Sequence, residues 1–360
     1  MTLVWAFGLS FLIAVVGTPI MARLSRRWGL LKAPGGRHIH PVPVPTLGGV
    51  PMAIAILGSS ALVAIPMGTP LAGFFSGGLV IVAVGLIDDI FGLSWKLKLL
   101  GQIAAGTVFA VFGGAVSLLT NPFVAFGAGL QLGWLGIPLT VVWVVAVINI
   151  VNLIDGLDGL ASGIAVIVGG AMTMVAMIRQ EAAVAVIALT VVGAAGAFLI
   201  YNFWPAKIFM GDVGSGLLGF ALAAVAVIGS VKDTTALTLA APLIALALPI
   251  FDTGFAIVRR VRMGQPIGRA DRDHIHHRLL GRGFGQRRAV ISLYLITALF
   301  GALAVLVVRF PSKLILATGL IVILATGLMA RRWGLFTMPQ ARKEPLDQEE
   351  GADRTEGLNP

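Results

Sequence analysis

The sequence has no cysteine and few charged residues. The absence of cysteine excludes disulfide bonds, thiolate metal sites and cysteine nucleophiles. Charged residues make up 12% of the 360 residues and hydrophobic residues 58%, a balance that excludes both an ordinary soluble domain and a disordered chain. The sequence also has no internal repeat with a period of 20–50 residues. We therefore expect one membrane-embedded domain.

Apolar runs long enough to cross a membrane recur along the chain and predict an all-α polytopic membrane protein. The first run has no basic residue before it and Arg23, Arg26 and Arg27 after it, the wrong polarity for a cleavable signal peptide. We expect a single membrane domain over residues 1–330 and a polar, disordered cytoplasmic tail over 331–360. About eleven spans are predicted, centred roughly near residues 12, 55, 80, 110, 143, 169, 192, 221, 246, 299 and 322.

The basic residues predict the orientation in the membrane. With eleven spans, all but four of the 26 Lys and Arg residues fall on one side, the exceptions being Arg179, Lys232, Arg309 and Lys313. The positive-inside rule then places the N-terminus outside and the C-terminus in the cytoplasm. The net charge of +10 is explained by this topology and by contact with anionic lipid rather than by binding to nucleic acid.

The acidic residues and histidines are one-sided too. Of the 16 acidic residues, only Glu181 and Asp233 fall in connections predicted to lie outside. The five histidines all fall on the cytoplasmic side: His38, His40, His274, His276 and His277. Charges on a merely solvated surface would be scattered over both sides, so this gathering predicts a single site that faces the cytoplasm.

Two amides and two carboxylates follow the fifth apolar run at a spacing of three residues: Asn149, Asn152, Asp155 and Asp158. Hydrocarbon solvates such groups poorly, so carboxylates at a membrane edge favour a functional interpretation. Residues three apart share a helix face, although each step drifts about 60° around the axis. Gly156 is expected to mark the fraying end of the helix. The pattern suits a site that handles cations or phosphates.

Asp88 and Asp89 end the third apolar run. Adjacent carboxylates at a helix C-terminus repel each other and oppose the helix dipole. A solvated helix end is one explanation. A metal, a proton-transfer role or a cationic partner explains the pair better, and Lys96 and Lys98 follow within a short connection.

Asp212 lies in the Gly-rich segment that opens the eighth span, where free backbone N–H groups favour anions. It is either a functional carboxylate or a helix N-cap. Phe209, three residues earlier, is a candidate for stacking on a planar base. Anchoring at the membrane interface is an equally good explanation of Phe209.

The 259–288 connection holds nine Arg and no Lys, and its histidines are His274, His276 and His277. Arg suits bidentate phosphate contacts better than Lys does. Three histidines in four residues also suit zinc, but no carboxylate or thiol completes an obvious ligand set. Contact with a phosphate or sugar, or proton transfer, is the preferred interpretation. Asp252, inside the ninth run, is assigned no chemical role.

Four motifs in order resemble the polyprenyl-phosphate N-acetylhexosamine-1-phosphate transferases over about residues 37–288: Asp88-Asp89, Asn149 to Gly159, Phe209-Met-Gly-Asp212-Val-Gly-Ser and His274-Ile-His-His277. The resemblance implies Mg²⁺-dependent transfer of a sugar 1-phosphate from a UDP-sugar to undecaprenyl phosphate, with release of UMP. The lipid-linked product starts the synthesis of a cell-envelope glycan, such as lipopolysaccharide or teichoic acid. The His-Ile-His-His order and eleven spans are similar to the branch that uses UDP-GlcNAc or a related UDP-N-acetylhexosamine.

The resemblance also implies roles for individual residues. Asp212 would bind Mg²⁺, with Asn152 a second ligand and Mn²⁺ a possible substitute. Asp88, beside Asp89, would deprotonate or orient the lipid phosphate. The catalytic set is completed by Asp155 and Asp158, which would line the nucleotide pocket. The implied substrate-binding residues are Lys98, Asn202, Phe209, His274, His276, His277 and Arg278.

Several alternatives stay open at this point. The peptidoglycan branch of the same family, which uses UDP-MurNAc-pentapeptide, typically has three consecutive histidines. An ion-coupled transporter also combines many helices with membrane carboxylates, but such carriers usually place ionisable residues near the midplane. The predicted enzyme lies in the plasma (inner) membrane with its site on the cytoplasmic face. The sequence leaves open which amino sugar is used and whether the protein forms a homodimer. It also leaves open whether the reaction is a direct attack or passes through a covalent intermediate.

Overall fold

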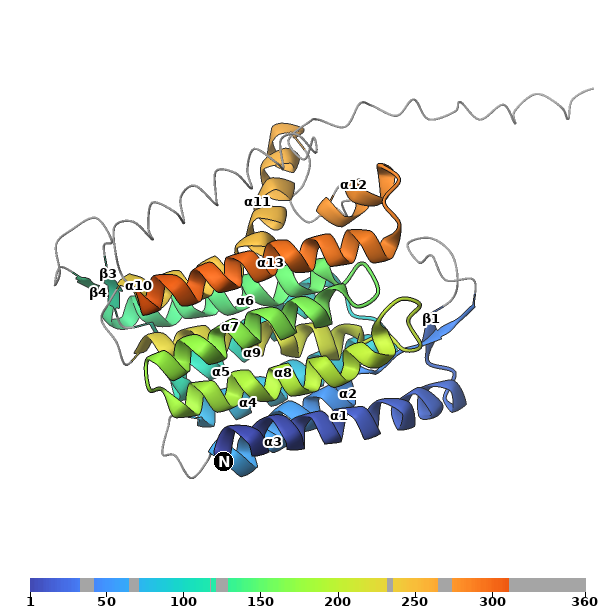
Figure 1. Ribbon diagram of the computed structural model, residues 1–360, viewed down its shortest axis with the longest axis horizontal. Helices are drawn as coiled ribbons and strands as arrows, with labels where there is room; N and C mark the ends of the chain where they lie inside the picture. Colours follow the sequence, from blue (N-terminus) through green and yellow to red (C-terminus); the bar gives the residue numbers. More distant parts are fainter. Residues whose placement is uncertain are drawn as a thin grey trace, which may run out of the picture.

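The computed structural model describes residues 1–32, 42–64, 71–116, 118–120, 129–231, 236–264 and 274–310. Its long helices lie side by side with their axes roughly aligned in one bundle (Figure 1). The helices are α1 Thr2–Arg27, α2 Gly49–Ala53, η1 Ile54–Gly58, α3 Ser59–Ala64, α4 Ala72–Phe91, α5 Trp95–Gly113, η3 Gly133–Leu135, α6 Gly136–Ile154, α7 Leu160–Ile178, α8 Ala182–Asn202, α9 Gly211–Val231, α10 Ala236–Ala245, α11 Ala247–Arg262, α12 Ile275–Gly281 and α13 Gln286–Arg309. The strands form two short antiparallel pairs, β1 Leu31–Lys32 with β2 Val44–Pro45 and β3 Leu118–Thr120 with β4 Gly129–Gln131.

The prediction of an all-α polytopic membrane protein is confirmed. Among the described residues, eight helices are long and apolar enough to cross a membrane. They are α1, α4, α5, α6 with the η3 turn before it, α7, α8, α9 and α13. Each coincides with a predicted span. The structure does not confirm the count of eleven or the orientation of the termini. The predicted eleventh span near residue 322 and the tail over 331–360 lie outside the described residues.

Two predicted spans differ from a regular α-helix in the structure: the second contains a π-helical turn, and the ninth is broken. The second consists of α2, the π-helical turn η1 and α3, over Gly49–Ala64. The ninth is divided at Leu246 into α10 and α11, and α11 stands away from the bundle axis (Figure 1). The cause of this break is Pro249, which has no N–H to donate to the carbonyl of Ala245 and whose ring would crowd that carbonyl in a continuous helix. A hydropathy average over the apolar run cannot detect such a break.

Helix α9 lies at the centre of the bundle. In its most apolar stretch, within Gly211–Gly229, 94% of the residues are buried. Glycines permit this close packing. A Cβ atom at Gly85 of α4 would lie 2.7 Å from the Val213 backbone of α9, and one at Gly219 of α9 would lie 2.6 Å from the Ile148 Cα of α6. Small residues let membrane helices approach this closely. The ends of α4 and α6 are thereby held against the start of α9.

The predicted carboxylates come together because of the helix directions. Helices α4, α6 and α8 end, and α5, α9 and α13 begin, at the end of the bundle on the right of Figure 1. Asp88, Asp89, Asp155, Asp158 and Asp212 all lie at these helix ends or in the connections between them. Glu181 is the N-cap of α8, and this helix begins at the opposite end of the bundle.

Candidate active site

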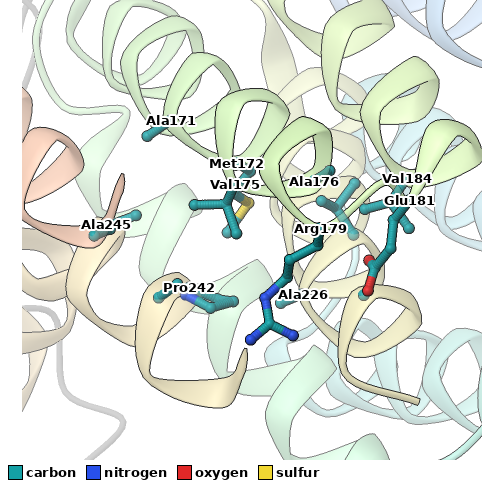
Figure 2. Close-up of a pocket in the computed structure, with 14 residues that line it drawn as sticks. Ala171, Met172, Val175, Ala176, Arg179, Glu181, Val184, Ala226, Pro242 and Ala245 are labelled. Carbon is teal, nitrogen blue, oxygen red and sulfur yellow. The ribbon is translucent and has the colours of Figure 1, made fainter. Parts of the chain in front are cut away.

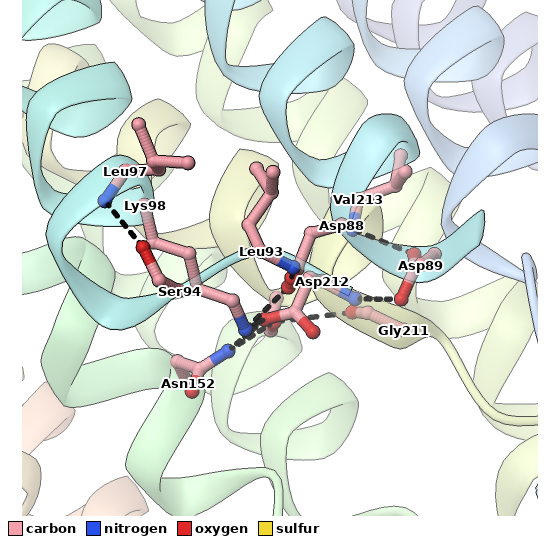
Figure 3. Close-up of polar contacts among 11 residues, drawn as sticks. Asp88, Asp89, Leu93, Ser94, Leu97, Lys98, Asn152, Gly211, Asp212 and Val213 are labelled. Carbon is pink, nitrogen blue, oxygen red and sulfur yellow. Dashed lines mark hydrogen bonds and ion pairs between the residues drawn. The ribbon is translucent and has the colours of Figure 1, made fainter. Parts of the chain in front are cut away.

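Two carboxylates and one ammonium group meet where α4, α5 and α9 converge. Lys98 forms an ion pair with Asp88, and its Nζ lies 3.4 Å from Asp212 Oδ1 (Figure 3). The amide nitrogen of Asn152, on α6, donates a hydrogen bond to the same Asp212 oxygen at 2.9 Å. Asp88, Asn152 and Asp212, which were predicted from three different segments, therefore form one network. Lys98, the predicted substrate-binding lysine, connects the two carboxylates.

The connection between α4 and α5 fixes Asp88 and Lys98. Asp88 is 8% exposed, and its Oδ1 accepts a hydrogen bond of 2.6 Å from the backbone N–H of Leu93. Ser94 caps α5, so Lys98 lies in the first turn of that helix. A cation is disfavoured at a helix N-terminus. The two nearby carboxylates offset this cost, which explains why a lysine occupies the position.

Asp89 faces away from this network and caps α9. Its Oδ1 accepts a hydrogen bond from the backbone N–H of Asp212 at 2.8 Å, and its Oδ2 accepts one from Val213 at 3.1 Å (Figure 3). A Cβ atom at Gly211 would lie 2.3 Å from Asp89 Oδ2, so the contact requires glycine there. The sequence offered Asp212 as a possible N-cap. In the structure the capping carboxylate is Asp89, and Asp212 is the second residue of the helix.

A small pocket among α4, α5, α6 and α9 is lined by these residues and their neighbours. Its polar lining consists of Asp88, Lys98, Gln102, Asn152 and Asp212. Its apolar lining comes from Ile81, Val84 and Ile148, together with Gly85 and Gly216. Apolar and charged side chains therefore share one small pocket at this end of the bundle.

The four polar residues spaced by three, from Asn149 to Asp158, do not all point towards the same neighbouring helix. Asn149 donates a hydrogen bond of 2.6 Å to Gln102 Oε1 on α5, whereas Asn152 faces α9. Asp155 follows the last residue of α6, and Asp158 lies in the next connection. The drift of about 60° per step explains this spread, because it turns successive side chains from α5 towards α9.

Asp158 and Asn202 connect two loops. Asp158 Oδ2 accepts a hydrogen bond of 2.8 Å from the backbone N–H of Ala206. Asn202 accepts one of 3.0 Å from the N–H of Gly159 and donates one of 3.0 Å to the carbonyl of Ile208. Both side chains are buried, with exposures of 7% and 3%. They hold the α6–α7 and α8–α9 connections together, and their predicted contact with nucleotide stays a prediction.

Asp155 has a markedly perturbed acidity. Burial raises the pKa of its carboxyl group to about 8, with the charges of Asp212, Asp158 and Asp89 adding to the effect and Lys32 opposing it. Perturbed acidity of this size is frequent at functional sites, although structural networks produce it as well.

The histidine segment contacts the α6–α7 connection. His274 and His276 are 3% and 2% exposed, and their rings are parallel with centroids 5.9 Å apart. The His276 ring lies on Gly156, where an added Cβ would be 2.5 Å from Nε2. Burial lowers the pKa of His276 to about 3. His277 and Arg278 follow on α12 and are half-buried. The structure thus places this segment beside Asp155.

Phe209 joins the α8–α9 connection to the segment before α2. Its backbone N–H donates to the carbonyl of Pro45, and its carbonyl accepts from the N–H of Gly48, both at 2.9 Å. Its ring is half-buried, and stacking on a base stays a prediction. His38 and His40 lie outside the described residues.

A second cavity lies at the opposite end of the bundle, between α7, α8, α9 and α10. Its walls are mainly apolar, with Met172, Val175 and Pro242 among them, and Arg179 and Glu181 lie at its edge (Figure 2). It contains none of the predicted site residues. Among the residues that the structure describes, no cluster of three or more His, Cys, Asp or Glu side chains is arranged to hold a metal ion.

Comparisons with known proteins find a family model that matches part of the chain and relatives that cover most of it. Glycosyl transferase family 4 matches residues 71–230. A probable undecaprenyl-phosphate N-acetylglucosaminyl 1-phosphate transferase of Bacillus subtilis is 35% identical, over 84% of this chain and 84% of that protein. A decaprenyl-phosphate N-acetylglucosaminephosphotransferase of Mycobacterium tuberculosis is 34% identical, over 79% and 77%. A phospho-N-acetylmuramoyl-pentapeptide-transferase of Halalkalibacterium halodurans is 29% identical, over 85% and 96%.

The fold and the site define a multi-pass membrane protein with a carboxylate–lysine centre at one end of its helix bundle. The chain belongs to glycosyl transferase family 4, the polyprenyl-phosphate N-acetylhexosamine-1-phosphate transferases, which confirms the predicted family. It is an enzyme that transfers a sugar phosphate to polyprenyl phosphate.

Proposed function

We propose that this enzyme transfers GlcNAc-1-phosphate from UDP-GlcNAc to undecaprenyl phosphate and releases UMP. The observation that carries the proposal is the convergence of Asp88 and Asp212 on Lys98, in a pocket among four membrane-spanning helices. The names of the Bacillus subtilis and Mycobacterium tuberculosis relatives support the sugar and the polyprenyl acceptor.

Both substrates carry negative phosphate groups, so the site must offset their repulsion. Lys98 supplies a positive charge beside Asp88, where the phosphate of the acceptor lipid would arrive. Asp88 would accept the proton of that phosphate or fix its orientation, so that an oxygen faces the β-phosphorus of the donor. Catalysis of such an in-line displacement consists mainly of positioning and charge stabilisation.

The residues at the centre fit Mg²⁺. Mg²⁺ favours oxygen ligands and needs only one or two carboxylates when waters and diphosphate oxygens complete its shell. Asp88 and Asp212 already converge on one cation, the Lys98 ammonium. Asp212 and Asn152 would hold the metal, and Mn²⁺ would be accepted by the same ligands. When bound, the ion would neutralise charge on the diphosphate.

The donor would lie across the neighbouring connections. Asp155 and Asp158 would line the nucleotide pocket, with Asn202 and Phe209 beside them. His274, His276, His277 and Arg278 would contact the diphosphate and sugar from α12. The proposed orientation puts this end of the bundle in the cytoplasm, at the plasma membrane, where nucleotide sugars are dissolved. The product would be the lipid-linked starter of a cell-envelope glycan.

The proposal is tested with purified protein, undecaprenyl phosphate, Mg²⁺ and four donors: UDP-GlcNAc, UDP-GalNAc, UDP-glucose and UDP-MurNAc-pentapeptide. We expect the highest kcat/KM for UDP-GlcNAc, weaker discrimination against UDP-GalNAc, and strong rejection of UDP-glucose because polar groups that bind the N-acetyl group would be left unpaired. Preference for the pentapeptide substrate would assign the enzyme to the peptidoglycan branch.

A further inference from the structure

Asp252 and His274 form a buried pair that joins α11 to α12. The two side chains are 9% and 4% exposed, and Asp252 Oδ2 lies 3.1 Å from His274 Nδ1. The other carboxylate oxygen, Oδ1, accepts a hydrogen bond of 2.9 Å from the backbone N–H of Ile275. Asp252 therefore contacts both the ring of His274 and the first residue of the helix that follows it.

This pairing determines which ring nitrogen of His274 is available to a ligand. An ionised carboxylate only accepts hydrogen bonds, so Nδ1 must carry a proton and donate it. Nε2 is the remaining polar atom of the ring, and it is buried with no hydrogen-bond partner among the described residues. Phosphate oxygens are acceptors. A ring that donates to Asp252 and to a phosphate must therefore be doubly protonated, with its charge balanced by Asp252.

The pair lies beside the α6–α7 connection, to which the proposed function assigns the donor substrate. The His276 ring lies parallel to the His274 ring and against Gly156, next to Asp155. His276 Nδ1 is likewise buried and has no hydrogen-bond partner among the described residues. Two unpartnered ring nitrogens of buried histidines thus lie in the segment that contacts the α6–α7 connection. Buried polar atoms of this kind require a partner, and a bound ligand would supply one.

We propose that Asp252 is a positioning residue that fixes His274 with Nδ1 protonated and directs Nε2–H to the β-phosphate of the UDP-sugar. This inference rests on the proposed function, because the β-phosphate is the group that the donor has and the product UMP lacks. Asp252 touches no substrate and acts only through His274. It also provides a reason for α11 to leave the bundle, since this direction brings a carboxylate to the histidine segment.

The test compares Asp252→Asn, His274→Ala and the double variant with the wild type. Asparagine keeps the acceptor for Ile275 but turns an N–H donor towards Nδ1, which removes the proton from that nitrogen. The ring is then neutral and keeps only Nε2–H, so its hydrogen bond to the β-phosphate loses the assistance of the positive charge. The KM for UDP-GlcNAc should therefore rise about tenfold. Inhibition by UMP should change less than twofold, because UMP has no β-phosphate. In the His274→Ala background, Asp252→Asn should have no further effect on KM.

Glu181→Gln, at the opposite end of the bundle, is the matched control and should leave both constants unchanged. An equal loss of affinity for UMP and UDP-GlcNAc would overturn the proposal in favour of general distortion. The proposal would also be overturned if Asp252→Asn raised the KM for UDP-GlcNAc in the His274→Ala background as much as it does in the wild type.

A measurement without substrate separates this inference from the proposed function. In ¹⁵N-histidine-labelled protein, we expect His274 Nδ1 to be protonated in the wild type and unprotonated in Asp252→Asn, with His274→Ala assigning the signal. An unchanged His274 signal in Asp252→Asn would refute the pairing. Absence of UMP release from every UDP-sugar by wild-type protein that shows the expected signal would refute the proposed function and the donor contact, while the Asp252–His274 pair would stand.

Discussion

The carboxylate of Asp89 accepts hydrogen bonds from the first turn of α9, and through the backbone N–H of Asp212 it holds the second carboxylate of the site in place. Asp88 and Asp89 are adjacent in sequence yet contribute differently. Successive residues of a helix point about 100° apart, so Asp88 faces Lys98 while Asp89 faces the helix start. One residue of the pair enters the charged network, and the other supports it.

This relationship predicts that Asp89 contributes to folding stability. Asp89→Ala should lower the free energy of unfolding by about 1–2 kcal/mol, the usual cost of losing a helix cap, and Asp89→Asn by less because one acceptor remains. The measurement is thermal unfolding in detergent without substrate or Mg²⁺. Unchanged stability in Asp89→Ala, combined with a loss of turnover, would instead indicate a direct role of Asp89 in the chemistry.

A second prediction concerns the contact between Gly156 and His276. In Gly156→Ala, the new methyl group would lie 2.5 Å from His276 Nε2 and would displace the ring. We expect the KM for the UDP-sugar to rise about tenfold, because overpacking moves the histidine segment. Gly170→Ala is the control, since an added Cβ there meets no atom within 4 Å. Equal kinetics of the two variants would show that the segment does not contact the donor.

A third prediction follows from the acidity of His276. Its pKa is lowered from 6.5 to about 3, so the folded protein keeps the ring neutral where the unfolded chain would protonate it. Stability should therefore be complete above pH 6.5 and fall as the pH decreases towards 3, by about 2 kcal/mol between pH 6.5 and 5. The measurement compares the unfolding of wild type and His276→Gln at both pH values. A pH dependence that is identical in the two proteins would contradict a buried neutral His276.

The predicted orientation has its own test, because the chain contains no cysteine. Gly281→Cys, at the exposed end of α12, should resist a membrane-impermeant thiol reagent in intact cells and react in inverted vesicles. Gln180→Cys, exposed at the opposite end of the bundle, should show the reverse pattern. The reverse result at both positions would place the site outside the cytoplasm.

Much of the fold could be predicted from the sequence because apolar length alone identifies a membrane helix. The gathering of Asp88, Asp155 and Asp212 at one end was also predictable, since each lies next to the end of an apolar run. The division of the ninth span was not predicted, because hydropathy averages over residues while the break depends on Pro249. Hydropathy and helix-end patterns depend on neighbouring residues, so they predict the long regular helices well.

The partners of the polar side chains depend on tertiary structure. Asp252 was assigned no role because nothing within its own helix indicates His274, 22 residues further along the chain. The cap formed by Asp89 joins residues 123 positions apart. Three-residue spacing also predicted one face for Asn149 and Asn152, whereas the packing of α5 and α9 gives each amide a different partner. Contacts of this range require the arrangement of the helices.

The most direct test of the central claim follows the β-phosphorus of the donor. Purified enzyme is incubated with undecaprenyl phosphate, Mg²⁺ and UDP-GlcNAc that carries ³²P at the β position, and the lipid is extracted. The account predicts that the label enters the lipid fraction with release of unlabelled UMP, and that Asp212→Asn reduces this transfer by at least about 100-fold. Label that stays in water-soluble UDP while the sugar reaches the lipid would contradict transfer of a sugar phosphate.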